Sequence, residues 1–206
     1  MKIIVVIGSP KPTNSASVHL LEALLPYLGE EHTVEIVALG RNVVDETQLV
    51  RLYDAQVWLF SFPVYFDGVP GHLLHSLERI AKNFDKKPSD AMVYAMVNSG
   101  FIEGEQNAVA IDLMYNWCER CGLRWGGGLG IGAGGMLGAM KNVPTGVGPR
   151  KALGKAFDVL AKQIISGTSG ETQFVSPNFP RRAYMIAAHH EFYKTLKLNG
   201  LKRRDI

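Results

Sequence analysis

The feature that most constrains the fold is a repeated alternation of short, continuously apolar runs with longer segments of helical period. Residues Ile3–Ile7 form the first such run. An unbroken run of β-branched residues is typical of a strand that is buried on both faces, because a half-exposed strand would alternate with polar residues. Strands of this kind occur in parallel sheets that helices cover on both sides. The chain is therefore expected to be an α/β protein.

Five strands and six helices are expected along the chain. The strands are Ile3–Ile7, Thr33–Leu39, Ala55–Phe62, Ala91–Val97 and Leu123–Ile131. The helices are Ser15–Leu28, Asp45–Leu52, Pro70–Phe84, Asn107–Cys121, Arg150–Ile165 and Arg181–Leu198. In the third of these, Leu73, Leu77, Ile80 and Phe84 share one face. Ligands of such folds bind at the carboxyl ends of the strands, so a binding site is expected in the loops that follow the strands.

Composition narrows the class of protein further. The chain has 206 residues, 47% of them apolar, which suits one large domain. Its two cysteines cannot build a disulfide framework, and this favours the cytoplasm. No stretch is long and apolar enough to cross a bilayer. Of the net charge of +3, residues 181–206 contribute 7 − 2 = +5, which we interpret as a solvated terminal helix rather than as a site for an anionic partner.

The first loop, Gly8–Ser17, has the composition of a phosphate cradle. It leaves a buried strand and enters a helix, where backbone N–H groups and the helix dipole favour an anion. Short polar side chains stand at Ser9, Asn14, Ser15 and Ser17. The loop lacks both the Gly-Lys-Ser/Thr of a Walker A loop and a G-x-G-x-x-G fingerprint. The alternative is an ordinary turn with a serine N-cap, which needs only one hydroxyl.

The loops after the third and fourth strands suit a planar ring. Pro63 and Pro70 stiffen the ends of one loop, and Gly68 allows a close backbone approach. Tyr65 and Phe66 offer flat apolar faces, although one of the two is expected to fill the core. In the other loop, residues 98–100 (Asn-Ser-Gly) offer hydrogen-bond donors, unless they merely cap the strand end.

Taken in order, three segments of the chain resemble the NADPH-dependent FMN reductase branch of the flavodoxin-like superfamily. They are Gly8-Ser9-Pro10-Lys11 with Ser15, then Pro63–Gly71, then Asn98–Phe101. The resemblance spans about residues 1–170 and implies a flavodoxin-like three-layer sandwich. Its five-stranded parallel sheet would have the order 2-1-3-4-5, with helices on both faces and an extra C-terminal helix. Residues 1–175 would form the FMN-binding domain, and residues 176–206 a helical extension packed on that domain or on a partner subunit.

The resemblance also implies which residues bind the cofactor. Phosphate contacts fall on Ser9, Lys11, Asn14, Ser15, Ala16 and Ser17. Ring contacts fall on Pro63, Val64, Tyr65, Phe66, Asp67 and Gly68, and pyrimidine contacts on Asn98, Ser99 and Gly100. Relatives often have arginine where this chain has Lys11, which supplies charge but no bidentate fork. Tyr65 is the side chain expected nearest the reacting face, and the flavin itself carries the chemistry.

The function expected from this resemblance is electron transfer from NAD(P)H through bound FMN to a quinone, a flavin or another small acceptor. The expected partners are that acceptor and further copies of the chain, in a homodimer or higher homo-oligomer. Neither nucleic acid, membrane nor metal is expected. Two alternatives remain: a flavodoxin-type carrier that binds FMN without turning over NAD(P)H, and a domain that binds another phosphorylated ligand or serves as a scaffold. Carriers are usually strongly acidic, whereas this chain has a net charge of +3.

Three further motifs receive other interpretations. The glycine-rich stretch Gly126–Gly138 contains a formal G-x-G-x-x-G, but it sits late in the chain and is expected to be a mobile loop over the flavin edge. Cys118 and Cys121 form a C-x-x-C pair at a helix end, whereas redox motifs prefer a helix N-terminus. The adjacent His189 and His190 point to different sides of a helix, which disfavours a metal site.

Overall fold

A single parallel sheet organises the computed structural model, which describes residues 1–84 and 90–202. Within those residues the sheet has six strands in the order β2-β1-β3-β4-β5-β6. The strands are β1 (Lys2–Ile7), β2 (Thr33–Ala38), β3 (Val57–Pro63), β4 (Met92–Asn98), β5 (Arg124–Ile131) and β6 (Gln173–Val175). Every neighbouring pair is parallel, so the carboxyl ends of all the strands lie along one edge of the sheet.

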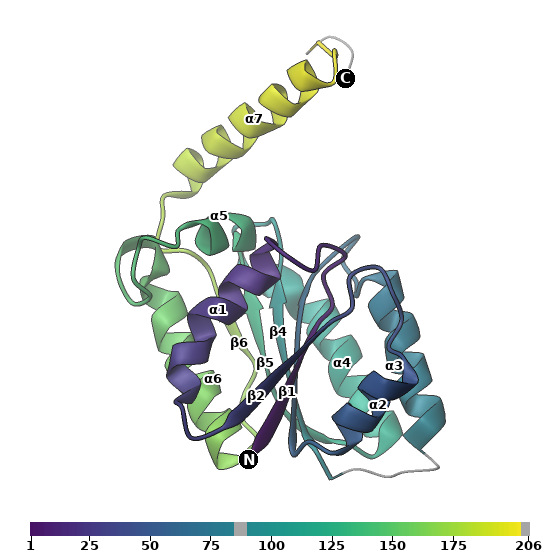
Figure 1. Ribbon diagram of the computed structural model, residues 1–206. Coiled ribbons are helices and arrows are strands. Elements are labelled where there is room, and N and C mark those ends of the chain that lie inside the picture. The colour runs from purple at the N-terminus through teal and green to yellow at the C-terminus, as the bar shows by residue number, and fades with distance from the viewer. Residues whose placement is uncertain (85–89, 203–206) are drawn as a thin grey trace.

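Helices cover both faces of this sheet, as Figure 1 shows. One face carries α1 (Ala16–Leu28), α5 (Gly134–Ala139) and α6 (Lys151–Ser166). The other carries α2 (Glu46–Tyr53), α3 (Gly71–Phe84) and α4 (Ala108–Cys121). Two short 3-10 turns, η1 (Gly104–Asn107) and η2 (Gly148–Arg150), join elements. The last helix, α7 (Arg181–Leu198), leaves the carboxyl edge of the sheet and extends away from the domain (Figure 1).

The sequence forms these elements for local reasons that the structure makes visible. Strands β3 and β4 are buried along nearly their whole length, in keeping with their continuous apolar runs. Helix α2 begins at Asp45, whose side chain accepts from the Gln48 N–H while the Gln48 side chain accepts from the Asp45 N–H, a complete capping box. Helix α4 ends at Gly122, which adopts the left-handed conformation expected of a helix stop.

The two sides of the sheet have separate cores. Trp58, Phe60 and Phe62 fill the side under α2, α3 and α4. Tyr94 and Phe157 fill the side under α1 and α6. Burial raises the pKa of Tyr94 to about 12, so this phenol stays neutral at any physiological pH. The fold class predicted from the sequence is therefore confirmed.

The sheet has six strands rather than the predicted five. The sixth, β6, is only three residues long and pairs with the outer edge of β5. Three residues are too few to give a periodic signal, and it is the open edge of β5 that recruits them. The predicted core position of Phe84 lies outside the described side chains.

The glycine-rich stretch is not a mobile loop. Most of its glycines lie in the buried strand β5 and in the short helix α5, which was not predicted. At most of the glycines in β5 a side chain would collide with the neighbouring element: a Cβ on Gly126 would lie 2.3 Å from the Tyr94 ring, and one on Gly128 would lie 2.6 Å from Ile111. The glycines therefore mark close packing across both faces of an inner strand.

Gly132, which follows β5, gives a test of this close packing. A Cβ there would lie 2.2 Å from the Ile102 carbonyl oxygen, a backbone atom that cannot move aside freely. We expect Gly132→Ala to lower the free energy of unfolding by about 2 kcal/mol or more. The control is Gly135→Ala in α5, where a Cβ meets nothing within 4 Å and should be neutral or stabilise by up to about 1 kcal/mol. Urea denaturation of both variants measures the difference, and equal stabilities would contradict the packing argument.

Candidate functional site

The three loops singled out in the sequence lie side by side at the carboxyl edge of the sheet. They follow β1, β3 and β4, which are consecutive neighbours. Hydrogen bonds continue the pairing beyond the strands: the Gly8 N–H donates to the Ser61 carbonyl oxygen (2.9 Å), and the Val64 N–H donates to the Asn98 carbonyl oxygen (2.8 Å). The beginnings of the three loops are thereby held in register, as a composite site requires.

The first loop wraps the N-terminus of α1. Ser15 is the N-cap, and its Oγ accepts from the Val18 N–H at a long 3.4 Å. The buried Ser9 Oγ accepts from the Lys11 N–H (3.2 Å). Asn14 adopts a positive φ of 53°, which folds the loop back over the helix terminus. The Ser15 hydroxyl and the first N–H groups of a thirteen-residue helix thus lie together where this loop ends, a geometry that suits an anion.

Two of the predicted site residues are joined in the interior. The Ser17 Oγ donates to the Asn98 Oδ1 (2.8 Å), and both side chains are buried. The buried Ser61 Oγ donates to the Ser17 carbonyl oxygen (3.2 Å), which adds β3 to the same network. Sequence reasoning did not single out Ser61, because one serine within an apolar strand gives no signal. This network fixes α1, β3 and β4 relative to one another directly beneath the three loops.

The second loop is a tight, strained turn. Tyr65 and Gly68 exchange two backbone hydrogen bonds of 3.1 Å each. The two residues between them both have positive φ, 49° at Phe66 and 58° at Asp67, as in a type I′ turn. Glycine, asparagine and aspartate prefer such positions, whereas a phenylalanine there is an outlier. Strained turns of this kind concentrate at functional sites, where surrounding structure holds them.

The turn lifts both aromatic side chains out of the core. Phe66 is fully exposed at 105%, and Tyr65 is about half exposed at 47%. The expectation that one of them fills the core is therefore wrong. Val64 and Val69, on either side of the turn, pack against the core instead. Two flat apolar faces are left at the mouth of the site.

The third loop leaves one buried polar atom without a partner. The Ser99 backbone is held on both sides, since its N–H donates to the Ile131 carbonyl oxygen (3.1 Å) and its carbonyl accepts from the Gly134 N–H (2.8 Å). The Ser99 Oγ, however, is buried and makes no hydrogen bond with the described residues. Buried hydroxyls are nearly always paired, so this atom fits a ligand group that completes the site.

Two further features border the site, helix α5 and His72, and neither was predicted from the sequence. Helix α5 approaches closely, and a Cβ on Gly134 would lie 2.7 Å from the Cβ of Asn98. His72, in the first turn of α3, lies near the backbone of Gly8, and its buried Nε2 makes no hydrogen bond with the described residues. Desolvation lowers the pKa of His72, so the imidazole is neutral near pH 7. A single histidine on a helix gives no sequence signal, and only the sheet order brings it beside the first loop.

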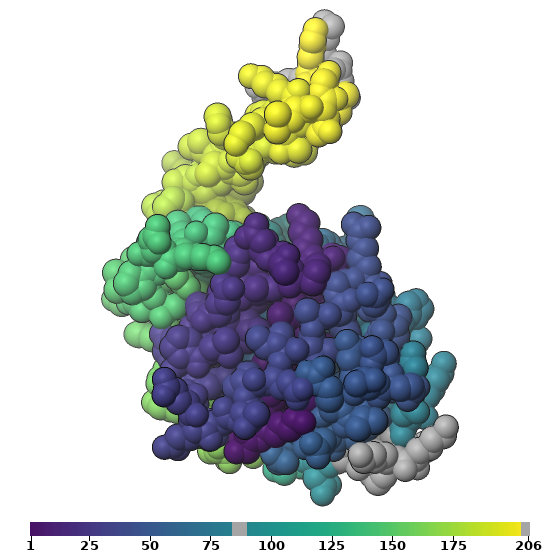
Figure 2. Space-filling model, viewed as in Figure 1, coloured from purple at the N-terminus to yellow at the C-terminus, as the bar shows by residue number. Residues whose placement is uncertain are grey.

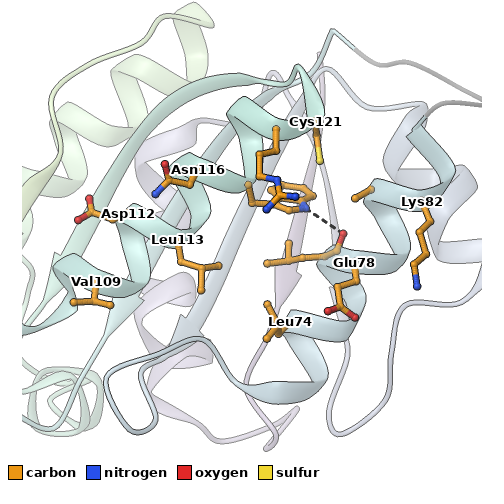
Figure 3. A pocket seen from close by; sticks show the side chains of 12 residues that line it. Leu74, Glu78, Lys82, Val109, Asp112, Leu113, Asn116 and Cys121 are labelled. Atoms are coloured by element: carbon orange, nitrogen blue, oxygen red, sulfur yellow. Dashed lines mark hydrogen bonds between the residues drawn. The ribbon is translucent and has the colours of Figure 1, made fainter.

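A cavity lies away from the three loops, between α3 and α4 (Figure 3). It has a volume of about 950 Å³ and is lined by residues of these two helices, none of them from the three loops. Trp117 lines it and donates its Nε1–H to the Leu77 carbonyl oxygen (3.1 Å). Cys121 lies at one end, whereas Cys118 is buried and its thiol pKa is raised, which leaves it unreactive. Cys118 thus lacks the lowered pKa of a redox motif.

Residues 1–84 and 90–202 contain no group of three or more histidine, cysteine or acidic side chains placed to hold a metal ion. Across the same ranges, each helix is too short or too polar to span a membrane.

Comparison with known proteins identifies one matching family and several solved structures with the same fold. A family model of NADPH-dependent FMN reductase matches residues 1–112, which include all three loops. No curated protein sequence matches the chain.

Solved structures with the same fold are only distantly related in sequence. An azoreductase from Bacillus anthracis str. Sterne is 15% identical, with a TM-score of 0.55 over 81% of this chain and 99% of its own. A flavodoxin, WrbA-like protein from Agrobacterium tumefaciens is 16% identical (TM-score 0.56, 81% and 96%). An NADPH-quinone reductase from P. pentosaceus is 12% identical (TM-score 0.59, 78% and 98%). At these identities the likeness establishes the fold alone.

The buried network beneath the loops can be tested directly. Ser17→Ala leaves the Asn98 Oδ1 buried without its donor, and we expect the free energy of unfolding to fall by about 1–3 kcal/mol. As a control, Ser166→Ala removes an exposed hydroxyl at the end of α6 and should change it by no more than about 0.5 kcal/mol. Chemical denaturation compares the two, and equal losses would show that the buried bond adds nothing.

Proposed function

This chain belongs to the NADPH-dependent FMN reductase family, and we propose that it carries electrons from NAD(P)H through bound FMN to a small, planar acceptor such as a quinone or a free flavin. Membership of the family makes it an FMN-dependent oxidoreductase with NAD(P)H as donor. The identity of the acceptor and the roles of individual residues are the proposal. The observation that carries it is the convergence of three loops on one edge of the sheet around the unpartnered Ser99 Oγ.

The chemistry of the described residues fits FMN at this edge. Bound FMN would supply the hydride acceptor and electron donor that no side chain can provide. We assign the phosphate to Ser9, Lys11, Asn14, Ser15, Ala16 and Ser17, where the helix N-terminus and the hydroxyls converge. The side chain of Ser17 is turned to Asn98, so its part in binding falls to its backbone N–H, one of the first of α1. A single helix terminus suits one phosphate group, which favours FMN over FAD.

The other two loops would orient the ring. We assign its dimethylbenzene and central parts to Pro63, Val64, Tyr65, Phe66, Asp67 and Gly68, and its pyrimidine edge to Asn98, Ser99 and Gly100. The Ser99 hydroxyl would there acquire the partner that it lacks. Tyr65 is the candidate for contact with the reacting face, because it is half exposed at the base of the strained turn.

The exposed aromatic rim favours flat acceptors. Phe66 projects fully into solvent, and Phe101 of the neighbouring loop is 54% exposed. Aromatic faces at the mouth of a site attract planar rings by stacking. Solved structures of the same fold include an azoreductase and an NADPH-quinone reductase. A planar aromatic acceptor is consistent with both.

A flavin titration with turnover tests the proposed function. Purified protein is expected to be yellow and to release FMN on denaturation, and NADPH should bleach the colour under anaerobic conditions. Ser15→Asp places a carboxylate against the phosphate, so we expect at least about a hundredfold weaker FMN binding with an unchanged circular dichroism spectrum. The control Ser15→Ala removes only the cap and should retain FMN. Recovery of FAD would exclude the proposed cofactor, and a bound flavin that NADPH cannot bleach would identify an electron carrier.

Helix α7 supports a proposal about assembly. Among its eighteen residues none is buried, and Figure 2 shows it standing clear of the domain. Ile186 is 70% exposed and Phe192 is 52% exposed. In proteins most of the stability of a helix comes from tertiary packing of its apolar side chains, and here those side chains are left uncovered. We propose that residues 176–206 are an extension whose helix packs against a second copy of the chain.

Light scattering on the full chain tests this assembly. We expect the wild-type protein to be a dimer, and Phe192→Glu to shift it toward the monomer, because a carboxylate would be buried in the contact. Ala187→Glu introduces the same charge at an exposed position that faces away from both Ile186 and Phe192, and it should remain a dimer. A monomeric wild-type protein would remove α7 from any interface between copies.

A further inference from the structure

The segment that leads into α7 runs along the third loop rather than away from it. The Gly132 N–H donates to the Val175 carbonyl oxygen (2.8 Å), and the Gly104 N–H donates to the Ser176 Oγ (3.1 Å). Further on, Arg181 forms an ion pair with Glu103. The Tyr184 hydroxyl then donates to the Gly100 carbonyl oxygen (2.6 Å). Tyr184 therefore contacts the loop that is expected to meet the pyrimidine edge, Ser176 and Arg181 contact the residues that follow this loop, and Val175 contacts the end of β5.

Each carbonyl of this loop is held by a different donor. The Ser99 carbonyl accepts from the Gly134 N–H (2.8 Å), and the Phe101 carbonyl accepts from the Ala133 N–H (2.5 Å). Both donors belong to the start of α5. The Gly100 carbonyl, which lies between them, accepts from the Tyr184 hydroxyl. Helix α7 thus holds one carbonyl of the loop through Tyr184, and the start of α5 holds the two on either side of it.

The directions of these carbonyls also fix the directions of the Gly100 and Phe101 N–H groups. In a planar trans peptide, the N–H of one residue points opposite to the carbonyl of the residue before it. The Gly100 N–H is thus turned away from α5, and the Phe101 N–H is turned away from Tyr184. Within residues 1–84 and 90–202, neither N–H has a hydrogen-bond acceptor. Gly100 is exposed and nothing crowds its Cα, so a ligand can reach this peptide.

We propose that Tyr184 is a positioning residue of the flavin site, which fixes the Gly100–Phe101 peptide so that consecutive backbone N–H groups face the pyrimidine edge of FMN. This inference rests on the proposed function. Negative charge collects at that edge when the flavin is reduced, and N–H donors aimed at it are stronger toward the charged form. The C-terminal extension thereby tunes the cofactor, in addition to any part in assembly. Glu103 and Arg181 beside it hold the first turn of α7 in place.

A purely structural role for Tyr184 makes a different prediction. If its hydrogen bond only anchored α7, removing the hydroxyl would affect oxidised and reduced FMN alike or affect neither. A positioning role requires a larger loss for reduced FMN, because the two donors interact more strongly with the charged ring. The difference between the two redox states is therefore the informative measurement, and it does not depend on turnover.

The experiment compares wild type, Tyr184→Phe and the control Tyr193→Phe as full-length proteins. Tyr193 lies on the same helix about 13 Å further along, at a rise of about 1.5 Å per residue. Fluorescence titration gives the Kd for oxidised FMN, and equilibration with reference dyes gives the midpoint potential of the bound flavin. For Tyr184→Phe we expect about threefold weaker binding of oxidised FMN and about tenfold weaker binding of reduced FMN. This ratio corresponds to a midpoint potential about 15 mV more negative.

The outcomes separate this inference from the proposed function. A shift in potential with Tyr184→Phe, together with wild-type values for Tyr193→Phe, supports the positioning role. An unchanged potential with Tyr184→Phe, whether its affinity falls or not, overturns it while FMN binding by the wild type stands. A shift of the same size in Tyr193→Phe also overturns it, because the effect would then come from α7 as a whole. Failure of the wild-type protein to bind FMN overturns the proposed function itself.

Discussion

The parallel pairing of β1, β3 and β4 is the constraint on which the rest of the molecule depends. Parallel neighbours cannot be joined by tight turns, so each connection must cross a face of the sheet, and every loop that leaves a strand begins at the same edge. The pairing continues past the strands through the bonds from Gly8 to Ser61 and from Val64 to Asn98. Three loops far apart in sequence are therefore neighbours before any ligand is considered.

A firm base and a projecting rim follow from that pairing. The base is the buried network of Ser17, Ser61 and Asn98, in which low polarity strengthens each satisfied hydrogen bond. The rim is the turn around Phe66, whose positive φ persists because two backbone hydrogen bonds close it. Between them lies the unpartnered Ser99 hydroxyl. A site that orients a ring, rather than merely enclosing it, needs a rigid base and a polar group that can hydrogen-bond the ring. Here the base is the buried network, and the polar group is the Ser99 hydroxyl.

The far edge of the sheet connects this site to the C-terminus. Strand β6 pairs with β5, and this pairing directs the following chain back across the carboxyl edge. The contact of Tyr184 with the third loop and that of Ser176 with the start of η1 are a consequence of that direction. An extension that looks separable in sequence thus touches the loop that is expected to bind the cofactor, while the rest of α7 remains available to another molecule (Figure 1).

Much of the fold could be predicted because its signals are local. Continuous apolar runs give β1, β3 and β4, helical spacing gives α1 and α6, and Gly122 ends α4. The three loops were recognisable because small polar residues, prolines and glycines cluster within a few positions. Their juxtaposition also followed, since parallel strands order their carboxyl ends. By contrast β6 and α5 were missed, because three and six residues are too few to show a period.

The sequence by itself determined the layers of the fold, the edge at which a ligand can bind and the polar loops that meet there. Only the tertiary structure decided how individual side chains are used. It turned Ser17 toward Asn98 across 81 positions of sequence, and Tyr184 toward Gly100 across 84. It also exposed Phe66 and buried the glycines of β5. These outcomes depend on contacts between distant segments, and a local pattern holds no information about which distant neighbour a side chain will meet.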